Sequence, residues 1–211
     1  MKLVDESIEA FCRSHSFPPS QVSEALAKYT LANVPCSIML CGPLVGCFLG
    51  LMARTIGAKR ALEVGCYTGY SALWMAENLP QNGEVVSLDI NPDTAKVAQQ
   101  FWSKSPHGKK IRLELGDARK TLETLKGPFD LVFIDANKEG YIHYAERALE
   151  LLSSNGVIIA DNCLYSGEVV EENLEGNALH IRKFDEWVAA RSDLYQTLLP
   201  IRDGLFVLRK L

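Results

Sequence analysis

The chain has 211 residues, of which 47% are hydrophobic and 23% are charged, and its formal net charge is −4. This length and composition are those of one soluble globular α/β domain with a substantial core. Acidic and basic residues are mixed along the chain, which argues against a nucleic-acid partner, because such binders usually carry a basic face.

Targeting and metal-binding signals are weak in the first part of the chain. Residues 1–6 lack the basic start and apolar run of a signal peptide. The longest apolar stretch, near Pro43 to Ala53, is too short to span a bilayer. We therefore expect a cytoplasmic protein with no membrane partner. The six cysteines form no CxxC pair and no cluster with histidine, so we expect reduced cysteines that fill core or pocket space rather than a zinc site.

The order of elements predicts a single domain, 1–211, with a helical part over 1–55 and a core over 56–211. In the first part, helices are expected at Val4–Arg13, at Pro19–Leu31 and after Pro43. In the core, short apolar runs alternate with longer amphipathic segments. Strands are expected at Ala61–Val64, Glu84–Leu88, Ile111–Leu115, Leu131–Ile134 and Val157–Ala160. Helices are expected to begin near Gly69, Pro92, Ala118, Gly140 and Ala178.

This alternation predicts the fold class α/β, with a mostly parallel sheet flanked by helices on both faces. The last two apolar pieces, Tyr195–Leu199 and Gly204–Arg209, are joined by a short link and predict an antiparallel C-terminal hairpin at one edge. In such sheets ligands bind beyond the carboxyl ends of the strands. The residues that close each strand are therefore the candidates for function.

The first three strands end in residues that suit a nucleoside. Gly65 and Gly69 form a G-x-x-x-G turn after Glu63, and such a turn lets the backbone approach a ligand. A dinucleotide would favour G-x-G-x-x-G, so a cofactor without phosphates fits better. Asp89 closes the second strand, where a carboxylate receives ribose hydroxyls. Gly116-Asp117-Ala118 closes the third and could frame a flat base, although Asp117 also suits a helix cap.

The next two strands end in oxygen ligands. Asp135 follows one strand, and Asp161 with Asn162 follows the other. Two carboxylates brought together repel, and this arrangement favours a bound cation. Oxygen ligands suit magnesium, with manganese and calcium as alternatives, rather than zinc. Taken singly, Asp161 could cap a helix and Asp135 could merely end a strand. Lys138, three residues after Asp135, favours the site.

Two motifs give this region a specific resemblance. Phe133 to Tyr141 reads F-I-D-A-N-K-x-x-Y, and Ala160 to Val169 reads A-D-N-x-L-x-x-G-x-V. With Gly42-Pro43 and Asp203-Gly204-Leu205, these motifs resemble the catechol and caffeoyl-coenzyme A O-methyltransferases. The resemblance covers roughly residues 35–211. It implies the Rossmann-like fold of class I methyltransferases, with extra N-terminal helices.

The resemblance also implies a cofactor, a metal and an acceptor. The cofactor is S-adenosylmethionine, and its expected contacts are Met39, Cys41, Glu63, Gly65, Tyr67, Ser71, Asp89, Asp117, Ala118 and Asp135. Within this set Ser71 would hold the carboxylate of the cofactor. The metal ligands are Asp135, Asp161 and Asn162, and Lys138 is the catalytic residue, acting as general base. The acceptor is a small phenol with two neighbouring hydroxyls, and the family resemblance suggests a homodimer.

Other features leave the acceptor open. Leu44 and Val45 stand where many relatives carry acidic or amide residues, and Tyr165 stands where many have tryptophan. No clear equivalent is found of the acidic residue with which catechol enzymes hold the second hydroxyl. Tyr141 and Tyr144 could frame the acceptor, but their spacing fits packing equally well. The alternative functions are a methyltransferase acting on an amine or RNA, and a non-catalytic S-adenosylmethionine-binding protein.

Overall fold

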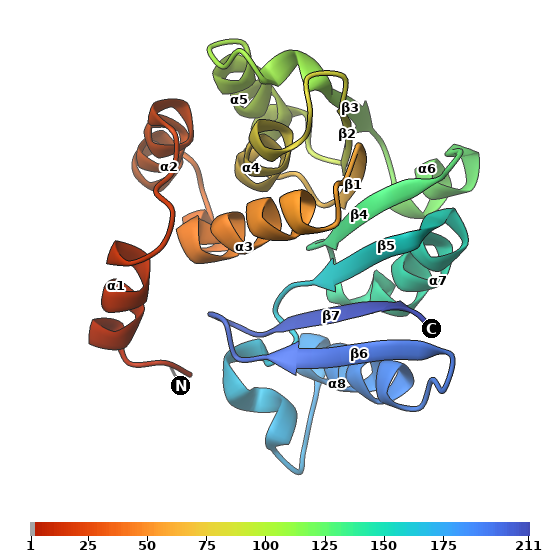
Figure 1. The fold of residues 1–211 in the computed structure, drawn as a ribbon. Coiled ribbons are helices and arrows are strands. Elements are labelled where there is room, and N and C mark those ends of the chain that lie inside the picture. Colours follow the sequence, from red (N-terminus) through yellow and green to blue (C-terminus); the bar gives the residue numbers. More distant parts are fainter. Residues whose placement is uncertain (1–2) are drawn as a thin grey trace.

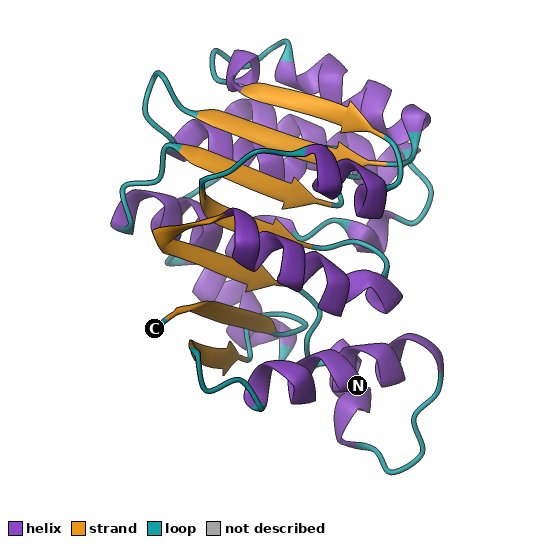
Figure 2. Cartoon of the chain, turned by 90° about the vertical axis from the view of Figure 1, so that its right-hand side faces the viewer, coloured by secondary structure: helices purple, strands orange, loops and turns teal. Residues whose placement is uncertain are grey.

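The structure is a computed structural model that describes residues 3–211, and its centre is one seven-stranded sheet. The strand order is β3-β2-β1-β4-β5-β7-β6 (Figures 1 and 2). The first five strands pair in parallel, and β7 is antiparallel to both β5 and β6. The strands are β1 Arg60–Val64, β2 Glu84–Asp89, β3 Ile111–Leu115, β4 Phe129–Ile134, β5 Leu152–Ala160, β6 Leu194–Leu199 and β7 Leu205–Lys210. The predicted mostly parallel sheet and its antiparallel hairpin are confirmed.

Helices precede the sheet and cover both of its faces. The α-helices are α1 Glu6–Ser14, α2 Gln21–Asn33, α3 Gly42–Thr55, α4 Tyr70–Asn78, α5 Pro92–Trp102, α6 Ala118–Thr124, α7 Tyr141–Leu151 and α8 Gly176–Ala189. Short 3-10 helices lie at η1 Ser37–Met39, η2 Gly108–Lys110, η3 Lys138–Gly140 and η4 Tyr165–Val170. The start of α5 shows why these boundaries fall where they do. Pro92 takes the first helical position, and the side chain of Asn91 accepts a hydrogen bond from the backbone of Asp93.

The core has two layers, one on each side of the sheet. Helices α3, α4 and α5 cover one face, and α6, α7 and α8 cover the other (Figure 1). Successive residues of a strand point to opposite faces, so each strand supplies both layers. In β4, for example, Leu131 and Phe133 pack in the first layer, whereas Val132 and Ile134 pack in the second. All four are fully buried, as the continuous apolar run of a parallel strand requires.

Helix α3 belongs to the first layer. The segment Ser37–Thr55 has 19 residues and a mean hydropathy of 1.6, so by length and composition alone it could cross a membrane. It is thus longer than the apolar stretch apparent in the sequence. In the fold, Val45 and Leu49 are fully buried, and a Cβ on Gly46 would lie 2.5 Å from the ring of Trp74. Close packing against α4 is therefore what the glycines and apolar residues of α3 provide.

Strand β5 differs from its prediction at its start. It begins at Leu152 rather than at Val157, and Leu152 pairs with Phe129 before the register shifts. The intervening residues are polar or glycine, because this end of the strand lies at the surface. Ser153, for instance, donates a hydrogen bond from its hydroxyl to Asp130 at 2.8 Å. An apolar run cannot reveal such a stretch.

Helix α8 carries a partly buried carboxyl group, Asp185, which predicts a pH effect on stability. Burial raises the pKa of Asp185 to about 7, and its Oδ1 has no hydrogen-bond partner among the described residues. The pKa of Asp185 is higher in the folded state than in the unfolded chain, so between about pH 4 and about pH 7 the folded state binds a proton at Asp185 that the unfolded chain does not. The stability that this proton contributes is fully present below about pH 4 and is lost as pH rises through about 7.

We therefore expect Asp185→Asn to raise the unfolding temperature at pH 8 more than at pH 5, measured by thermal unfolding across that range. Asp193→Asn is the control, because the pKa of Asp193 is lowered to about 2 and the group does not titrate in this window. A difference between Asp185→Asn and the wild type that stays constant with pH would contradict the prediction.

Candidate active site

A cavity of about 1300 Å³ opens at the carboxyl ends of the parallel strands. The turns after β1 to β5, the segment before α3 and the β6–β7 turn all contribute to its lining. All but one of the predicted site residues line it. These are Met39, Cys41, Gly65, Tyr67, Ser71, Asp89, Asp117, Ala118, Asp135, Lys138, Asp161 and Asn162. The structure thus brings together residues that lie as far apart in the sequence as Met39 and Asn162.

The turn after β1 is built around Asp89. The backbone N–H groups of Cys66 and Tyr67 donate to Asp89 Oδ2 at 2.9 and 2.6 Å. Gly65 has a φ of +100°, and a Cβ there would lie 2.1 Å from the carbonyl oxygen of Asp135. Only glycine allows the turn after β1 to pass this close to the end of β4. The expected ribose contact of Asp89 stays a prediction, as does the cofactor contact of Tyr67.

Glu63 is the predicted site residue that does not line the cavity. Its side chain is fully buried beneath the cavity and accepts hydrogen bonds from the hydroxyls of Ser71 and Ser87. Burial raises the pKa of Glu63 to about 8. Glu63 therefore orients the hydroxyl of Ser71 from beneath the cavity, and Ser71 itself lines the cavity. A direct cofactor contact of Glu63 stays a prediction.

Asp117 caps a helix and also lines the cavity, and its expected place beside a flat base stays a prediction. Its side chain caps α6 by accepting a hydrogen bond from the backbone of Arg119 at 3.0 Å. Asp117 also pairs with the guanidinium of Arg119 at 3.2 Å. At the same time Asp117 and the following Ala118 line the cavity. A capping residue is therefore also available to a ligand at this strand end.

The end of β5 lies against the end of β4, and the two strand ends place the carboxylates of Asp161 and Asp135 side by side. The backbone N–H of Asp161 donates to the carbonyl of Ile134 at 2.9 Å, which places Asp161 next to Asp135. The Asp161 side chain is buried, and the residue is only 3% exposed. Burial, together with the charge of Asp135, raises the pKa of Asp161 to about 7. This pair of carboxylates therefore favours a positive charge beside it.

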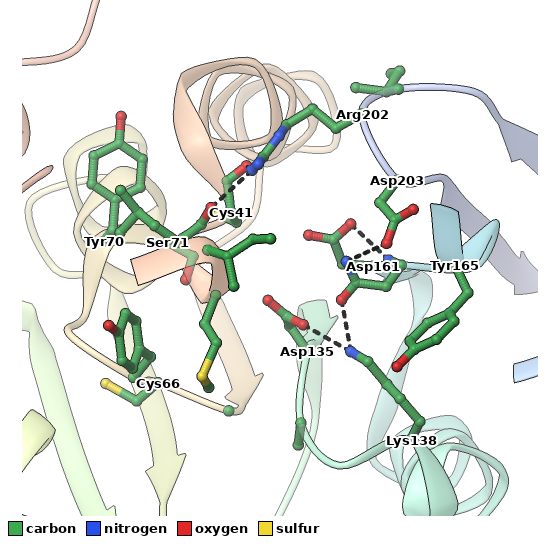
Figure 3. A pocket seen from close by; sticks show the side chains of 18 of the residues that line it. Cys41, Cys66, Tyr70, Ser71, Asp135, Lys138, Asp161, Tyr165, Arg202 and Asp203 are labelled. Atoms are coloured by element: carbon green, nitrogen blue, oxygen red, sulfur yellow. Dashed lines mark hydrogen bonds and ion pairs between the residues drawn. The ribbon is translucent and has the colours of Figure 1, made fainter. Parts of the chain in front are cut away.

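Lys138 supplies a positive charge at this place (Figure 3). Its Nζ donates to Asp135 Oδ1 at 3.1 Å, to Asn162 Oδ1 at 2.7 Å and to the hydroxyl of Tyr141 at 2.6 Å. All three donors of an ammonium group are thus used. The ammonium contacts two of the three predicted metal ligands, Asp135 and Asn162, and supplies there part of the positive charge that a cation would bring.

The donor set fits a hard divalent cation. Asp135, Asp161 and Asn162 offer two carboxylates and one amide oxygen, the ligands that magnesium, manganese and calcium prefer. Among residues 3–211 no cluster of three or more His, Cys, Asp or Glu side chains with metal-binding geometry is found. Two carboxylates with an amide as the third ligand are compatible with the geometry.

Sequence reasoning left out Tyr141, which the structure places in the site. Tyr141 is fully buried, and its hydroxyl accepts from Lys138 and donates to the carbonyl of Asp161 at 2.9 Å. Its place three residues after Lys138 in the quoted motif was the available signal. Tyr144 is buried as well, and it donates from its hydroxyl to Asn137. Tyr141 therefore packs in the core and also holds Lys138 beside the backbone of Asp161.

The β6–β7 turn adds two residues with no assigned role in the sequence analysis. Arg202 donates from its guanidinium to the carbonyls of Leu40 and Cys41, at 2.8 Å for Leu40 (Figure 3). Asp203 accepts from the side-chain amide of Asn162 at 3.0 Å. For Arg202 the sequence held no signal, because its partners lie about 160 residues away.

Known proteins resemble this chain over most of its length. A family model described as O-methyltransferase matches residues 13–211. The chain is 35% identical to "Catechol O-methyltransferase" of Niastella koreensis, over 83% of this chain and 81% of that protein. It is 31% identical to "Caffeoyl-CoA O-methyltransferase" of Stellaria longipes, over 90% and 84% of the two chains. The structure matches an SAH-bound methyltransferase from Podospora anserina with a TM-score of 0.89 at 30% identity, covering 98% and 94% of the chains.

The close approach of Gly65 to Asp135 predicts a large stability effect. Gly57 is a matched control, because it also has a positive φ, of +62°, but an added Cβ there meets nothing within 4 Å. Gly57→Ala should lower the free energy of unfolding by about 1–2 kcal/mol, the cost of the left-handed backbone. Gly65→Ala should add an overpacking cost of about 1–3 kcal/mol. Urea unfolding measures both, and equal losses would show that the contact with Asp135 does not constrain the turn.

Proposed function

Because the chain belongs to the O-methyltransferase family, we propose that it transfers a methyl group from S-adenosylmethionine to one hydroxyl of a vicinal diphenol. A divalent cation held by Asp135, Asp161 and Asn162 is part of this proposal. The observation that carries it is the convergence of these three oxygen ligands with Lys138 at the ends of neighbouring strands β4 and β5 (Figure 3). The relatives named after catechol and caffeoyl-CoA support the choice of acceptor.

The cofactor part of the proposal is supported by the cavity and by structural relatives. Solved methyltransferases of this fold from Podospora anserina and Bacillus cereus are described as SAH-bound, and SAH is the demethylated form of the proposed cofactor. In this chain the glycine turn after β1 and the carboxylates of Asp89 and Asp117 line the same cavity. These groups suit a nucleoside that carries hydroxyls and no phosphate.

The acceptor needs help to react, because a free phenol loses its proton only near pH ~10. A divalent cation, when bound, supplies Lewis-acid stabilisation of the ionised hydroxyl and a fixed orientation for two neighbouring hydroxyls. Magnesium is the proposed metal, with manganese and calcium as alternatives. The buried carboxylate of Asp161 and the partly buried carboxylate of Asp135 make the site attractive to a dication and unattractive to an anion.

Lys138 is the base in this proposal: a divalent cation bound beside it would favour the neutral amine over the ammonium, and Nζ would then have a lone pair to accept the proton. Its Nζ lies 3.1 Å from Asp135 Oδ1, within reach of an acceptor hydroxyl held beside that carboxylate. Tyr141 and Asn162 hold Nζ in place from two other sides. The cofactor, when bound, would supply the methyl group from its sulfonium, with the electron pair of the broken carbon–sulfur bond left on sulfur as the acceptor oxygen takes the methyl carbon.

The proposal extends to a second copy of the chain, packed through the N-terminal helices. Helix α1 has no buried residue, and its apolar side chains Ile8 and Phe11 are 55% and 63% exposed. Apolar side chains gathered on one exposed helix support a protein contact. The family resemblance suggests that this contact forms a homodimer.

The first prediction of the proposed function concerns the acceptor. We expect methyl transfer from labelled S-adenosylmethionine to vicinal diphenols but not to matched monophenols, and only when magnesium is present. The measurement is label incorporation, with magnesium and with excess chelator. Transfer that continues in chelator would contradict the cation site. Transfer to amines or RNA in place of diphenols would favour the alternative nucleophile, and cofactor binding without any transfer would favour a binding protein.

The second prediction concerns the base. Lys138→Ala should lower turnover by about 10²–10⁴-fold, the usual contribution of a general base, and leave cofactor affinity unchanged. Lys183→Ala, an exposed lysine of α8 outside the cavity lining, is the matched control and should keep full turnover. Turnover is measured with the best diphenol of the panel, and affinity by calorimetry. Near-normal turnover of Lys138→Ala would remove Lys138 from the mechanism.

A further inference from the structure

The β6–β7 turn docks onto the loop that carries the ligands Asp161 and Asn162. The backbone N–H of Leu164 donates to the carbonyl of Asp203 at 2.8 Å, and the N–H of Cys163 donates to the carbonyl of Gly204 at 3.0 Å. Gly204 has a φ of +91°, and a Cβ there would lie 2.7 Å from the backbone nitrogen of Leu164. The backbone alone thus holds residue 203 at this loop, whatever its side chain.

The Asp203 side chain uses both of its oxygens on the same loop. Oδ2 accepts from the side-chain amide of Asn162 at 3.0 Å, and Oδ1 accepts from the backbone N–H of Ser166. Figure 3 shows Asp203 beside the end of β5. An ionised carboxylate can only accept hydrogen bonds. It therefore requires a donor from each of its two partners.

This requirement decides which end of the Asn162 amide faces the site. The two ends of an amide are nearly equal in shape, so a hydrogen-bond network has to choose between them. With Nδ2 donating to Asp203, Oδ1 faces Lys138 Nζ, 2.7 Å away, and the same Nζ also contacts Asp135. In the opposite orientation an NH₂ group would face the ammonium, or a cation in its place, and would repel it.

We infer that Asp203 is a positioning residue that keeps Asn162 Oδ1 turned toward the cation. The inference rests on the proposed function, because the cation is part of that proposal. Asp203 itself contacts neither the carboxylates nor Lys138 in the described hydrogen bonds and acts through Asn162. Groups that orient a metal ligand typically contribute about 10–100-fold to metal affinity.

In Asp203→Asn, the NH₂ group of the new side chain faces another hydrogen-bond donor. The new amide has one acceptor, which can serve either Ser166 N–H or Asn162 Nδ2, while its NH₂ group faces the other donor. This clash between two donors is relieved if the side-chain amide of Asn162 rotates by half a turn, and that rotation points its NH₂ group into the site. In an Asn162→Asp background the same substitution is compatible. There the new amide accepts from Ser166 and donates to the new carboxylate, whose second oxygen still faces the cation.

The test is Mn²⁺ binding to the cofactor-loaded protein, followed by electron paramagnetic resonance of free Mn²⁺. Four proteins form a double-mutant cycle: wild type, Asp203→Asn, Asn162→Asp, and both substitutions together. We expect Asp203→Asn to weaken Mn²⁺ binding by about 10–100-fold in the Asn162 background, as for other groups that orient ligands. In the Asn162→Asp background we expect no weakening. Asp193→Asn, outside the cavity lining, is the charge-matched control and should bind Mn²⁺ as the wild type does.

Each other outcome overturns a stated claim. An equal loss in both backgrounds would mean that Asp203 acts only through its charge, and no loss in either would mean that it has no role. Both results overturn the inference and leave the proposed function standing. A wild-type protein that does not bind Mn²⁺ would overturn the proposed cation site and the inference with it. Should Asp203→Asn alone fail to fold, the two proteins with Asn162→Asp still distinguish orientation from charge.

Discussion

The site depends on the repulsion between two carboxylates that the sheet forces together. Asp135 and Asp161 end adjacent parallel strands, and Asp161 is buried deeply enough for its pKa to rise to about 7. Two such groups in a poorly solvated place need a positive charge between or beside them. The ammonium of Lys138, three residues after Asp135, supplies such a charge, and the proposed divalent cation would supply it as well.

The surrounding structure holds these charged side chains in fixed positions. The turn after β1 presses against the backbone of Asp135, and this contact requires glycine at position 65. Tyr141 links Lys138 to the backbone of Asp161, so that one buried phenol fixes the lysine and the second strand end together. The order of strands places this arrangement beside the junction of β1 and β4, where the order in which successive strands are added to the sheet reverses, the usual place for ligands in a parallel sheet.

Much of this could be predicted from the sequence, because the information was local. Strand runs such as Leu131–Ile134 are apolar and bounded by polar residues, and the residue after each run marks a strand end. The features that were missed depend on distant partners or on burial. The depth of Glu63 follows from packing against Ser71 and Ser87, and the roles of Arg202 and Asp203 follow from contacts more than 35 residues away. No spacing within the chain encodes such contacts.

The central claim is that the cation site ionises the acceptor, and a chromophoric diphenol tests it most directly. The absorbance spectrum of 4-nitrocatechol changes when the diphenol loses a proton. We would record it at a pH below the solution pKa of 4-nitrocatechol, with SAH-loaded protein, before and after magnesium is added, and again after excess chelator. The account predicts that the spectrum of the ionised form appears only with protein and magnesium together and disappears with chelator. A bound diphenol whose spectrum stays that of the neutral form, or one that is indifferent to chelator, would contradict it.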